Sequence, residues 1–356
     1  MNSYRFFLLA VIVAMAETGQ AQVKKNKAQP NILWITCEDM SPHLGSYGDS
    51  QVKTPHLDKL ASEGIRYTRA FATAGVCAPS RSAIITGMYQ QSIGTQHMRT
   101  AKLSANKDAY PPDYVGYSAL VPEAVKCFPE YLRAAGYYCT NNAKEDYQFE
   151  APPTVWDESS RKGHWRNRKN AEQPFFAVFN LMTTHESQVW ERANEPLLVD
   201  PKNVQVPPYY PDVPEVRKDI ARHLSNVMVM DQQAGEILSQ LEQDGLSDNT
   251  IIFFFSDHGD GLPFVKREIY DRGTRVPLII KFGKNSESAN PFGTKKGIVN
   301  DQLVSFVDLA PTVLSLAGCA IPNHLQGQAF LGSAKGTPRK YIFAARDRMD
   351  SEYDRV

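Results

Sequence analysis

The chain has 356 residues, of which 42% are apolar, and its 39 basic and 39 acidic residues give a formal net charge of zero. This length fits one large α/β domain, and the apolar content excludes a disordered chain. The balanced charge excludes a protein that binds nucleic acid through its overall positive charge. It does not exclude a local basic patch that binds an anionic substrate.

The chain begins with a segment typical of a secretory signal. Arg5 supplies a positive charge, residues 6–16 form an apolar run, and small residues precede a cleavage point near Ala21. The run is too short to cross a bilayer core of roughly 30 Å, and no later segment approaches a spanning length. We therefore expect residues 1–22 to be a signal peptide and residues 23–356 to be the exported domain, in the periplasm or secreted.

The rest of the chain alternates apolar runs with helical patterns, which favours a mostly parallel sheet covered by helices on both faces. Strands are predicted at residues 31–37, 65–71, from 137, 175–181, 251–255 and 276–281. Helices are predicted from Thr54 to Gly64, at residues 123–135, 216–241 and 308–316, with Thr54 and Asp308 as N-caps.

Polar clusters follow three of these predicted strands. They are Glu38 with Asp39, Thr183 to His185, and Asp257 with His258. In parallel α/β folds, ligands bind outside the carboxyl ends of the strands. We therefore expect the three clusters to meet at one edge of the sheet and to form the functional site.

Carboxylates at strand ends predict a metal site. Glu38, Asp39 and Asp257 offer the hard oxygen donors that calcium or magnesium prefers, and His258 adds a nitrogen. A carboxylate directly after a buried strand is costly unless a cation or hydrogen bonds compensate. Glu38 with Asp39 alone, or Asp257 with His258 alone, would be explained equally well as a turn or a helix cap. The two pairs together favour a metal site.

The five cysteines are an odd number, which leaves at least one unpaired thiol in an exported protein. Cys77 is the candidate, because it lies at the predicted start of a helix, where a negative charge is stabilised. An unmodified thiol there would be reactive. The alternative is an inert buried cysteine, and the residue pattern alone does not decide between them.

The run from Cys77 to Arg81 resembles the C-x-P-S-R signature of type I sulfatases, in which the cysteine is oxidised to formylglycine. Other segments are similar to that family in the same order, over about residues 30–350. They are residues 30–40, Thr86 with Gly87, residues 136–144, residues 256–260, and Lys266 with Tyr270 and residues 275–277. The chain is thus identified as a member of the type I sulfatases, with the alkaline-phosphatase-like α/β fold this implies.

The resemblance implies that Cys77 becomes formylglycine through a formylglycine-generating enzyme or an anaerobic maturase. The hydrated aldehyde then attacks sulfur and later expels sulfate, so that one hard step becomes two easier ones. It also implies one calcium ion per chain, which lowers the pKa of the attacking hydroxyl. The implied calcium ligands are Glu38, Asp39, residue 77, Asp257 and His258.

The resemblance further implies roles for four side chains. Arg81 would hold the hydrated nucleophile, and Lys144 and Lys266 would neutralise the sulfate oxygens. His185 would protonate the leaving alcohol.

The chain departs from the family pattern after Lys144. Many members carry a histidine two residues after this lysine, but here Glu145 and Asp146 follow. Asp146 as a base, or His97 from another segment, would take the place of the missing histidine.

A second departure is the end at Val356, where the family usually continues into a small antiparallel subdomain. We therefore expect a C-terminally truncated chain that is unstable or prone to aggregate on its own.

The loop at residues 163–168 combines cations with an aromatic ring. Trp165 and Arg166 in this loop suit a sulfated sugar, and the alternative is a solvated basic loop.

The predicted function is hydrolysis of a sulfate ester on a sulfated glycan, whose sugar and position the sequence does not reveal. The rivals are a phosphonate or phosphate mono- or diester hydrolase of the same fold, and a non-catalytic glycan-binding relative.

Overall fold

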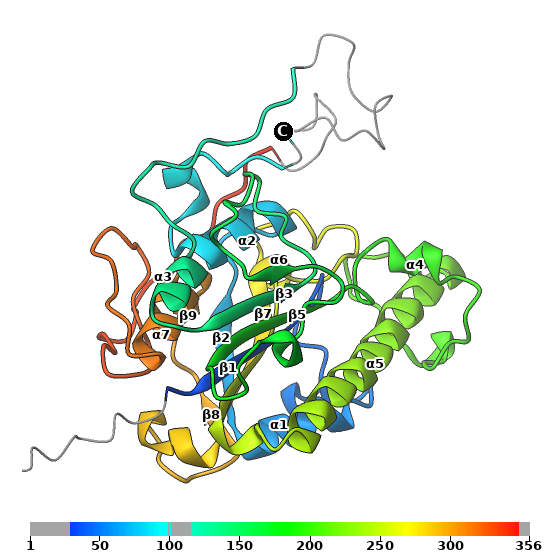
Figure 1. The fold of residues 1–356 in the computed structure, drawn as a ribbon. Coiled ribbons are helices and arrows are strands. Elements are labelled where there is room, and N and C mark those ends of the chain that lie inside the picture. Colours follow the sequence, from blue (N-terminus) through cyan, green and yellow to red (C-terminus); the bar gives the residue numbers. More distant parts are fainter. Residues whose placement is uncertain (1–28, 99, 101–114, 349–356) are drawn as a thin grey trace, which may run out of the picture.

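The computed structural model of the chain describes residues 29–98, 100 and 115–348 (Figure 1). The predicted signal peptide and residues 349–356 lie outside this part of the chain. In the described part, we find no helix that combines the length and the apolar character needed to cross a membrane.

The described strands form one nine-stranded sheet. They are β1 (Asn31–Cys37), β2 (Ile65–Phe71), β3 (Tyr138–Asn142), β4 (Glu158–Ser159), β5 (Phe175–Leu181), β6 (Thr250–Ser256), β7 (Arg275–Phe282), β8 (Ile298–Asn300) and β9 (Val304–Ser305). Their order is β4-β3-β5-β1-β6-β7-β2-β8, and β9 pairs with β2. The strand β7 runs antiparallel to both neighbours, while the other pairings are parallel. The predicted mostly parallel sheet is confirmed.

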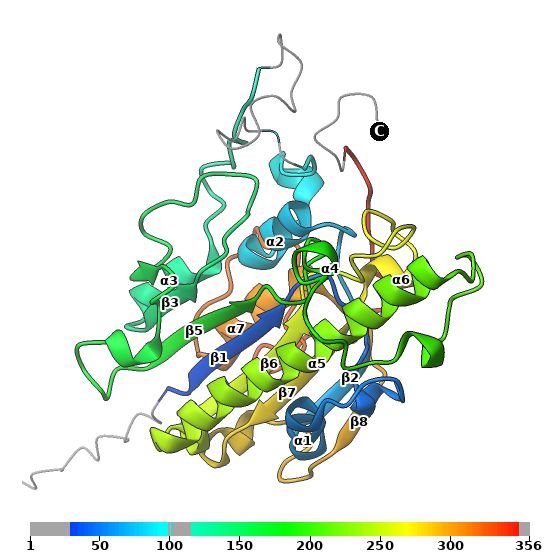
Figure 2. The same ribbon diagram turned by 90° about the vertical axis from the view of Figure 1, so that its right-hand side faces the viewer.

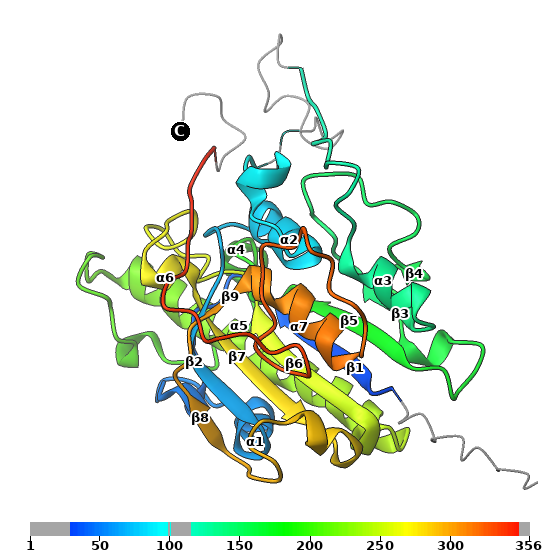
Figure 3. The ribbon, with the colours of Figure 1, turned by 90° about the vertical axis from the view of Figure 1, so that its left-hand side faces the viewer.

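Helices cover both faces of the sheet. They are α1 (Pro55–Glu63), α2 (Cys77–Thr86), α3 (Phe128–Ala134), α4 (Gln188–Glu191), α5 (Pro214–Gln243), α6 (Asp271–Thr274) and α7 (Leu309–Leu316). The long helix α5 and helix α1 lie across one face (Figure 2), and α2, α3 and α7 lie on the other (Figure 3).

The alternation of side chains along β1 explains the two layers. Ile32 and Trp34 belong to the core under α2, α3 and α7, and Leu33 and Ile35 belong to the core under α1 and α5. Successive strand residues point to opposite faces, so an apolar run is buried on both. The central strand β1 thus anchors the polar residues that follow Cys37.

Two local predictions were wrong. The helix predicted at 123–135 begins only at Phe128, because the backbone N–H of Cys127 donates to the Glu130 carboxylate and sets the first turn there. Thr54 and Asp308 precede helices as predicted, but neither side chain caps its helix. The Thr54 hydroxyl accepts from the backbone of Gly45 instead.

Candidate active site

The register of the sheet brings the predicted polar clusters together. Cys37, the last residue of β1, pairs with Leu181 of β5 on one side and with Ser256 of β6 on the other. Parallel strands in register end at the same edge. The residues that follow these three strands therefore share one edge of the sheet, as expected.

Cys77 is the first residue of α2 and is fully buried. Its Sγ lies 3.3 Å from His258 Nε2 and 3.9 Å from Asp39 Oδ1. Burial raises the pKa of the thiol, but the ammonium groups of Lys144 and Lys266 bring this pKa below its ordinary value. The surroundings of residue 77 therefore stabilise negative charge.

Four of the predicted metal ligands form one group. One ligand atom from each of Asp39, Cys77, Asp257 and His258 lies within 4.8 Å of the others, and all four residues are buried. His258 Nδ1 lies 2.9 Å from the Gly259 carbonyl, to which it donates as an N–H. Nε2 is therefore the ring nitrogen that can offer a lone pair to a cation, and it faces Asp39 Oδ1 at 3.1 Å.

The two aspartates of this group are held in place by backbone donors. Asp257 Oδ1 accepts from the N–H groups of Asp39 and His258, and Asp39 Oδ2 accepts from the N–H of Glu186. Asp39 itself has a φ of 50°, a left-handed conformation that is strained for a residue with a side chain. Fixed contacts at both carboxylates keep this conformation.

Glu38 lies on the other side of the nucleophile position. Its ligand atom lies within 4.8 Å of those of Cys77 and His185, and it forms no such group with Asp39, Asp257 and His258. Arg81 Nη2 donates to Glu38 Oε1 at 2.8 Å, and Lys144 Nζ lies 2.8 Å from the same oxygen. Glu38 is therefore neutralised by two cations in this structure.

Arg81 connects the two carboxylate groups. Besides Glu38, its guanidinium donates through Nε to Asp257 Oδ2 at 3.1 Å and through Nη1 to Asn180 Oδ1 at 2.9 Å. The side chain is 7% exposed, so these charged hydrogen bonds are shielded from water. Arg81 comes from the same helix as Cys77, four residues on, which places it one turn below the thiol.

Lys266 and His185 complete the surroundings of Cys77. Lys266 Nζ lies 2.6 Å from Asp39 Oδ2 and 3.0 Å from Glu186 Oε1. Burial lowers the pKa of His185, but its hydrogen bond with Cys77 and the charge of Asp39 raise this pKa above its ordinary value. The imidazole is thus favoured in its protonated form beside the thiol.

The two candidates for the missing histidine lie differently. Asp146 has a φ of 53°, and its Oδ2 lies 3.5 Å from Lys144 Nζ. His97 is half-buried, with no hydrogen-bond partner for its Nδ1 among the described residues. Its neighbour Met98 packs in one cluster with Cys77. The structure therefore puts the segments of both candidates beside the nucleophile position.

The predicted substrate contacts of Trp165 and Arg166 do not fit their positions. Trp165 is fully buried, stacks on Phe175 and donates its indole N–H to Asp244 Oδ2 at 2.7 Å. Arg166 Nε donates to the same carboxylate oxygen at 2.7 Å. Phe175 begins β5, so this cluster belongs to the strand's amino end rather than to the edge that carries Cys77. The aromatic ring fills the core and the cation ties down the loop.

Two further residues of the site were not singled out from the sequence, and a third, Ser80, was named only as part of the signature run from Cys77 to Arg81. Asn180 accepts from Arg81, and Glu186 pairs with Lys266 while its backbone orients Asp39. Ser80 donates its hydroxyl to the Asp257 carbonyl at 2.6 Å. Asn180 had a signal in the sequence, since it is the one polar residue in the apolar run of β5. The signal for Glu186 in the sequence was weaker, because only its position next to His185 pointed to the site.

Comparisons with known proteins agree with this geometry. Residues 30–319 match the family model described as Sulfatase. The chain is 46% identical to an ulvan-active sulfatase from Formosa agariphila over 380 residues, which cover 95% of this chain and 61% of that protein. It is 25% identical to N-sulphoglucosamine sulphohydrolase from Homo sapiens over 357 residues, which cover 88% of this chain and 67% of that protein.

Solved structures show the same fold. The chain superposes on the phosphonate monoester hydrolase SpPMH from Silicibacter pomeroyi with a TM-score of 0.65 at 18% identity, covering 88% of this chain and 78% of that one. It superposes on BT4656, solved with its substrate D-glucosamine-2-N,6-O-disulfate, with a TM-score of 0.62 at 19% identity, covering 88% of this chain and 82% of that one.

The family assignment rests on the match to the family model over most of the described residues and on the 46% identity to a sulfatase. The chain spans 61% of the length of this ulvan-active sulfatase. It spans 64% of the length of a second ulvan-active sulfatase from the same organism, to which it is 26% identical. With its alkaline-phosphatase-like fold, the chain belongs to the sulfatase family.

Proposed function

We propose that this chain hydrolyses sulfate esters on a sulfated glycan, with residue 77 as the nucleophile after its conversion to formylglycine. The observation that carries the proposal is the position of Cys77. It begins a buried helix, and three cations, Arg81, Lys144 and Lys266, lie around it together with His185. Once oxidised and hydrated, residue 77 would offer a hydroxyl that attacks sulfur, which the thiol does not.

The donor set beside residue 77 fits a calcium ion. Asp39 and Asp257 are fully buried, and although burial raises the pKa of each, neighbouring cations hold both values below the ordinary range. Two ionised carboxylates and His258 Nε2, which would give its lone pair to an ion, therefore lie together, and Glu38 lies in a second group that shares Cys77. A bound calcium ion would supply a Lewis acid for a sulfate oxygen and for the nucleophile.

The charges of the chain's own residues suit an anionic ester. The three carboxylates Glu38, Asp39 and Asp257 are matched by the three cations of Arg81, Lys144 and Lys266. Adding a divalent cation makes the site net positive, which attracts a sulfate group into a water-poor environment. Lys144 and Lys266 would neutralise the sulfate oxygens, and Arg81 would hold the nucleophile.

The leaving alcohol needs a proton, and His185 is the group placed to give it. Its pKa is raised by its contact with Cys77 and by the charge of Asp39, despite the opposing effect of burial. A protonated imidazole within reach of the nucleophile position acts as a general acid. Asp146 or His97 would take the proton in the second half of the reaction.

The substrate class follows from relatives rather than from the site. The 46% identical protein is an ulvan-active sulfatase, which supports a sulfated polysaccharide as substrate. Export to the periplasm or medium, and maturation of Cys77 by a formylglycine-generating or anaerobic enzyme, are parts of the same proposal. The first residues of the chain, which read as a signal peptide, support export.

The test combines mass spectrometry with paired substrates. The chain is produced in a host that has a maturation enzyme, and the peptide containing Cys77 is weighed. A loss of about 18 Da relative to cysteine marks the aldehyde. The matured protein is then assayed on ulvan oligosaccharides and on matched aryl sulfate and aryl phosphate esters, with Cys319→Ser as the matched control variant.

Each outcome of this test decides something. Release of sulfate by the matured chain and by Cys319→Ser supports the proposal. Faster turnover of the phosphate ester would favour the phosphoester hydrolase instead, and an intact thiol with glycan binding would favour a non-catalytic relative.

A further inference from the structure

A second cluster of ligand-type side chains lies outside the site around Cys77. One ligand atom each of His43, His223 and Asp260 lies within 4.8 Å of the others. His43 follows β1, His223 lies in α5, and Asp260 follows β6, so three separate elements meet here. His223 and Asp260 are buried, and His43 is nearly so.

The distances in this cluster suit a small transition-metal ion. His43 Nε2 lies 2.9 Å from Asp260 Oδ2, and His223 Nε2 lies 3.3 Å from Asp260 Oδ1. Zinc bonds of about 2.0–2.2 Å hold two tetrahedral ligands about 3.3–3.5 Å apart. The distance from His223 to Asp260 matches this spacing, and the distance from His43 to Asp260 is shorter by about half an ångström.

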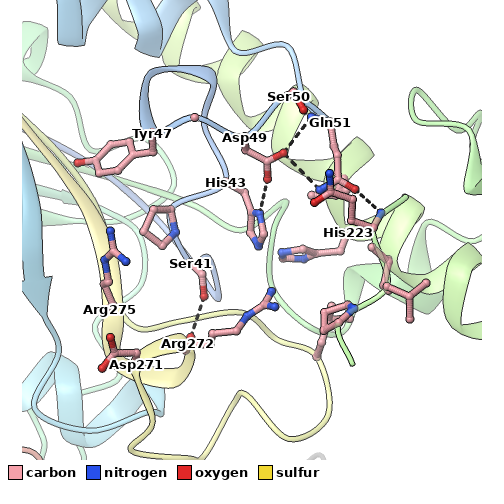
Figure 4. A pocket seen from close by; sticks show the side chains of 18 of the residues that line it. Ser41, His43, Tyr47, Asp49, Ser50, Gln51, His223, Asp271, Arg272 and Arg275 are labelled. Carbon is pink, nitrogen blue, oxygen red and sulfur yellow. Dashed lines mark hydrogen bonds and ion pairs between the residues drawn. The ribbon is translucent and has the colours of Figure 1, made fainter. Parts of the chain in front are cut away.

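His43 also has the partner that metal-bound histidines use. Its second ring nitrogen, Nδ1, lies 2.6 Å from Asp49 Oδ2 (Figure 4). A carboxylate on one ring nitrogen fixes the tautomer, orients the ring and makes the other nitrogen a better ligand. When the ring carries a single proton, on Nδ1 toward Asp49, the lone pair of His43 Nε2 points to Asp260 and is available to an ion.

An accessible pocket borders the cluster and offers a path for an ion. The pocket has a volume of about 580 Å³, and Figure 4 shows His43 and His223 together on its wall, above Arg272. A metal site with three protein ligands needs an open fourth position and an entry route. The pocket supplies the entry route on the side of His43 and His223, and none of the residues that line it is Cys77, Lys144 or Lys266.

Asp260 already has two other partners. Arg272 Nη2 donates to Oδ2 at 3.1 Å, and the backbone N–H of Ser41 donates to Oδ1 at 2.7 Å. Each carboxylate oxygen accepts from two directions, so both contacts leave a lone pair. The Arg272 side chain is 39% exposed and borders the pocket, so it has room to turn aside.

We propose that His43, His223 and Asp260 bind a divalent first-row transition ion, zinc, at a site separate from the calcium site. Two imidazoles and one carboxylate favour zinc over calcium, which takes mainly oxygen ligands. The ion ties together the segments that follow β1 and β6, which also carry Asp39 and Asp257. Its role is to fix these two segments to α5.

The test titrates zinc into the full chain in excess calcium, which occupies the oxygen-rich site. Equilibrium dialysis measures bound zinc, and cobalt in place of zinc reports tetrahedral coordination by its visible absorption. We expect one zinc per chain in the wild type and in Asp257→Ala. His223→Leu should lose this zinc, and Asp49→Asn, which keeps all three ligands, should weaken it about 10- to 100-fold.

Three results would overturn the proposal. One is no zinc bound to the wild type beyond the level of His223→Leu, as expected if His43 is instead a proton-bearing bridge between two carboxylates. Another is zinc lost in Asp257→Ala but kept in His223→Leu, which would place the ion beside Cys77. If His223→Leu does not fold, unchanged affinity in Asp49→Asn decides against the site.

Discussion

Lys266 Nζ lies 2.6 Å from Asp39 Oδ2, although the two residues are 227 positions apart in the chain. Lys266 is 2% exposed and Asp39 is fully buried, so water screens this pair very little. The same aspartate offers its other oxygen, Oδ1, toward His258 and Cys77. One carboxylate therefore links the predicted sulfate-binding lysine to the predicted metal site.

Replacing Lys266 should make the protein's stability depend on calcium. Lys266→Met leaves Asp39 buried without its cation, which costs about 3–5 kcal/mol of unfolding free energy. A bound calcium ion would neutralise the carboxylate and recover part of this loss. Melting temperatures with and without calcium measure the effect, and Lys284→Met, which removes an exposed surface pair with Asp248, is the control. An equal loss in both conditions would argue against calcium at Asp39.

Cys77→Ala should abolish turnover and leave the fold intact, because alanine has no group that can be oxidised to an aldehyde. The small side chain it replaces is buried among Val76, Ala78 and Met98, so only a modest loss of stability is expected. Rates on an aryl sulfate, with circular dichroism as a check on folding, measure both. Turnover at the wild-type rate would refute residue 77 as the nucleophile.

Asp257→Ala should lower calcium affinity and activity together, since it removes one of the two carboxylates that face His258. Chelation of the wild type should have the same effect, and added calcium should reverse it. Asp248→Ala, at an exposed position, is the matched control. An unchanged rate after metal removal, verified by elemental analysis, would show that these residues do not form a catalytic metal site.

Glu186 should contribute to stability only when it is ionised. Burial raises its pKa, but Arg267 and Lys266 hold the value below the ordinary range. A lowered folded pKa gives stability that is present above the unfolded value and is lost as pH falls through the folded value. The melting temperature of Glu186→Gln should thus fall short of the wild type at neutral pH and converge with it as the pH falls below the ordinary glutamate pKa of about 4.3. A gap that stays constant over this range would contradict the prediction.

Trp165 and Arg166 should matter for stability and not for substrate binding. Trp165→Ala empties a fully buried site and should cost about 3–5 kcal/mol. Arg166→Ala removes an exposed ion pair with Asp244, which adds little to stability, and should leave KM unchanged. Denaturant unfolding and steady-state kinetics measure the two quantities. A tenfold rise in KM for Arg166→Ala would restore it as a substrate contact.

The strands that carry the site could be predicted because they are fully buried. Runs such as those of β1, β5 and β6 have the length and apolar continuity of central parallel strands. The edge at which Glu38, His185 and Asp257 meet then follows from the rule that parallel strands end together. The reversed direction of β7 did not follow, because an apolar run has the same pattern in either direction.

Side-chain partners were the harder part. The loop containing Trp165 and Arg166 has the composition of a sugar-binding surface, but composition does not say which face of a loop is buried. The indole N–H and the guanidinium share Asp244, which is 78 residues or more away in the chain. Glu186 and Asn180 were missed for the same reason, since their roles depend on contacts with Lys266 and Arg81 across the sheet edge.

The reversal of β7 has a consequence for how this active site can change. The segment from Asp257 to Thr274 leaves β6 and returns in the neighbouring strand, so its two ends stay fixed beside each other. Doubling the length of such a closed loop costs only about 0.6 kcal/mol of chain entropy. Insertions beyond Lys266 would therefore change the loop beside Cys77 at little cost, while the strands and the predicted metal ligands Asp257 and His258 keep their places.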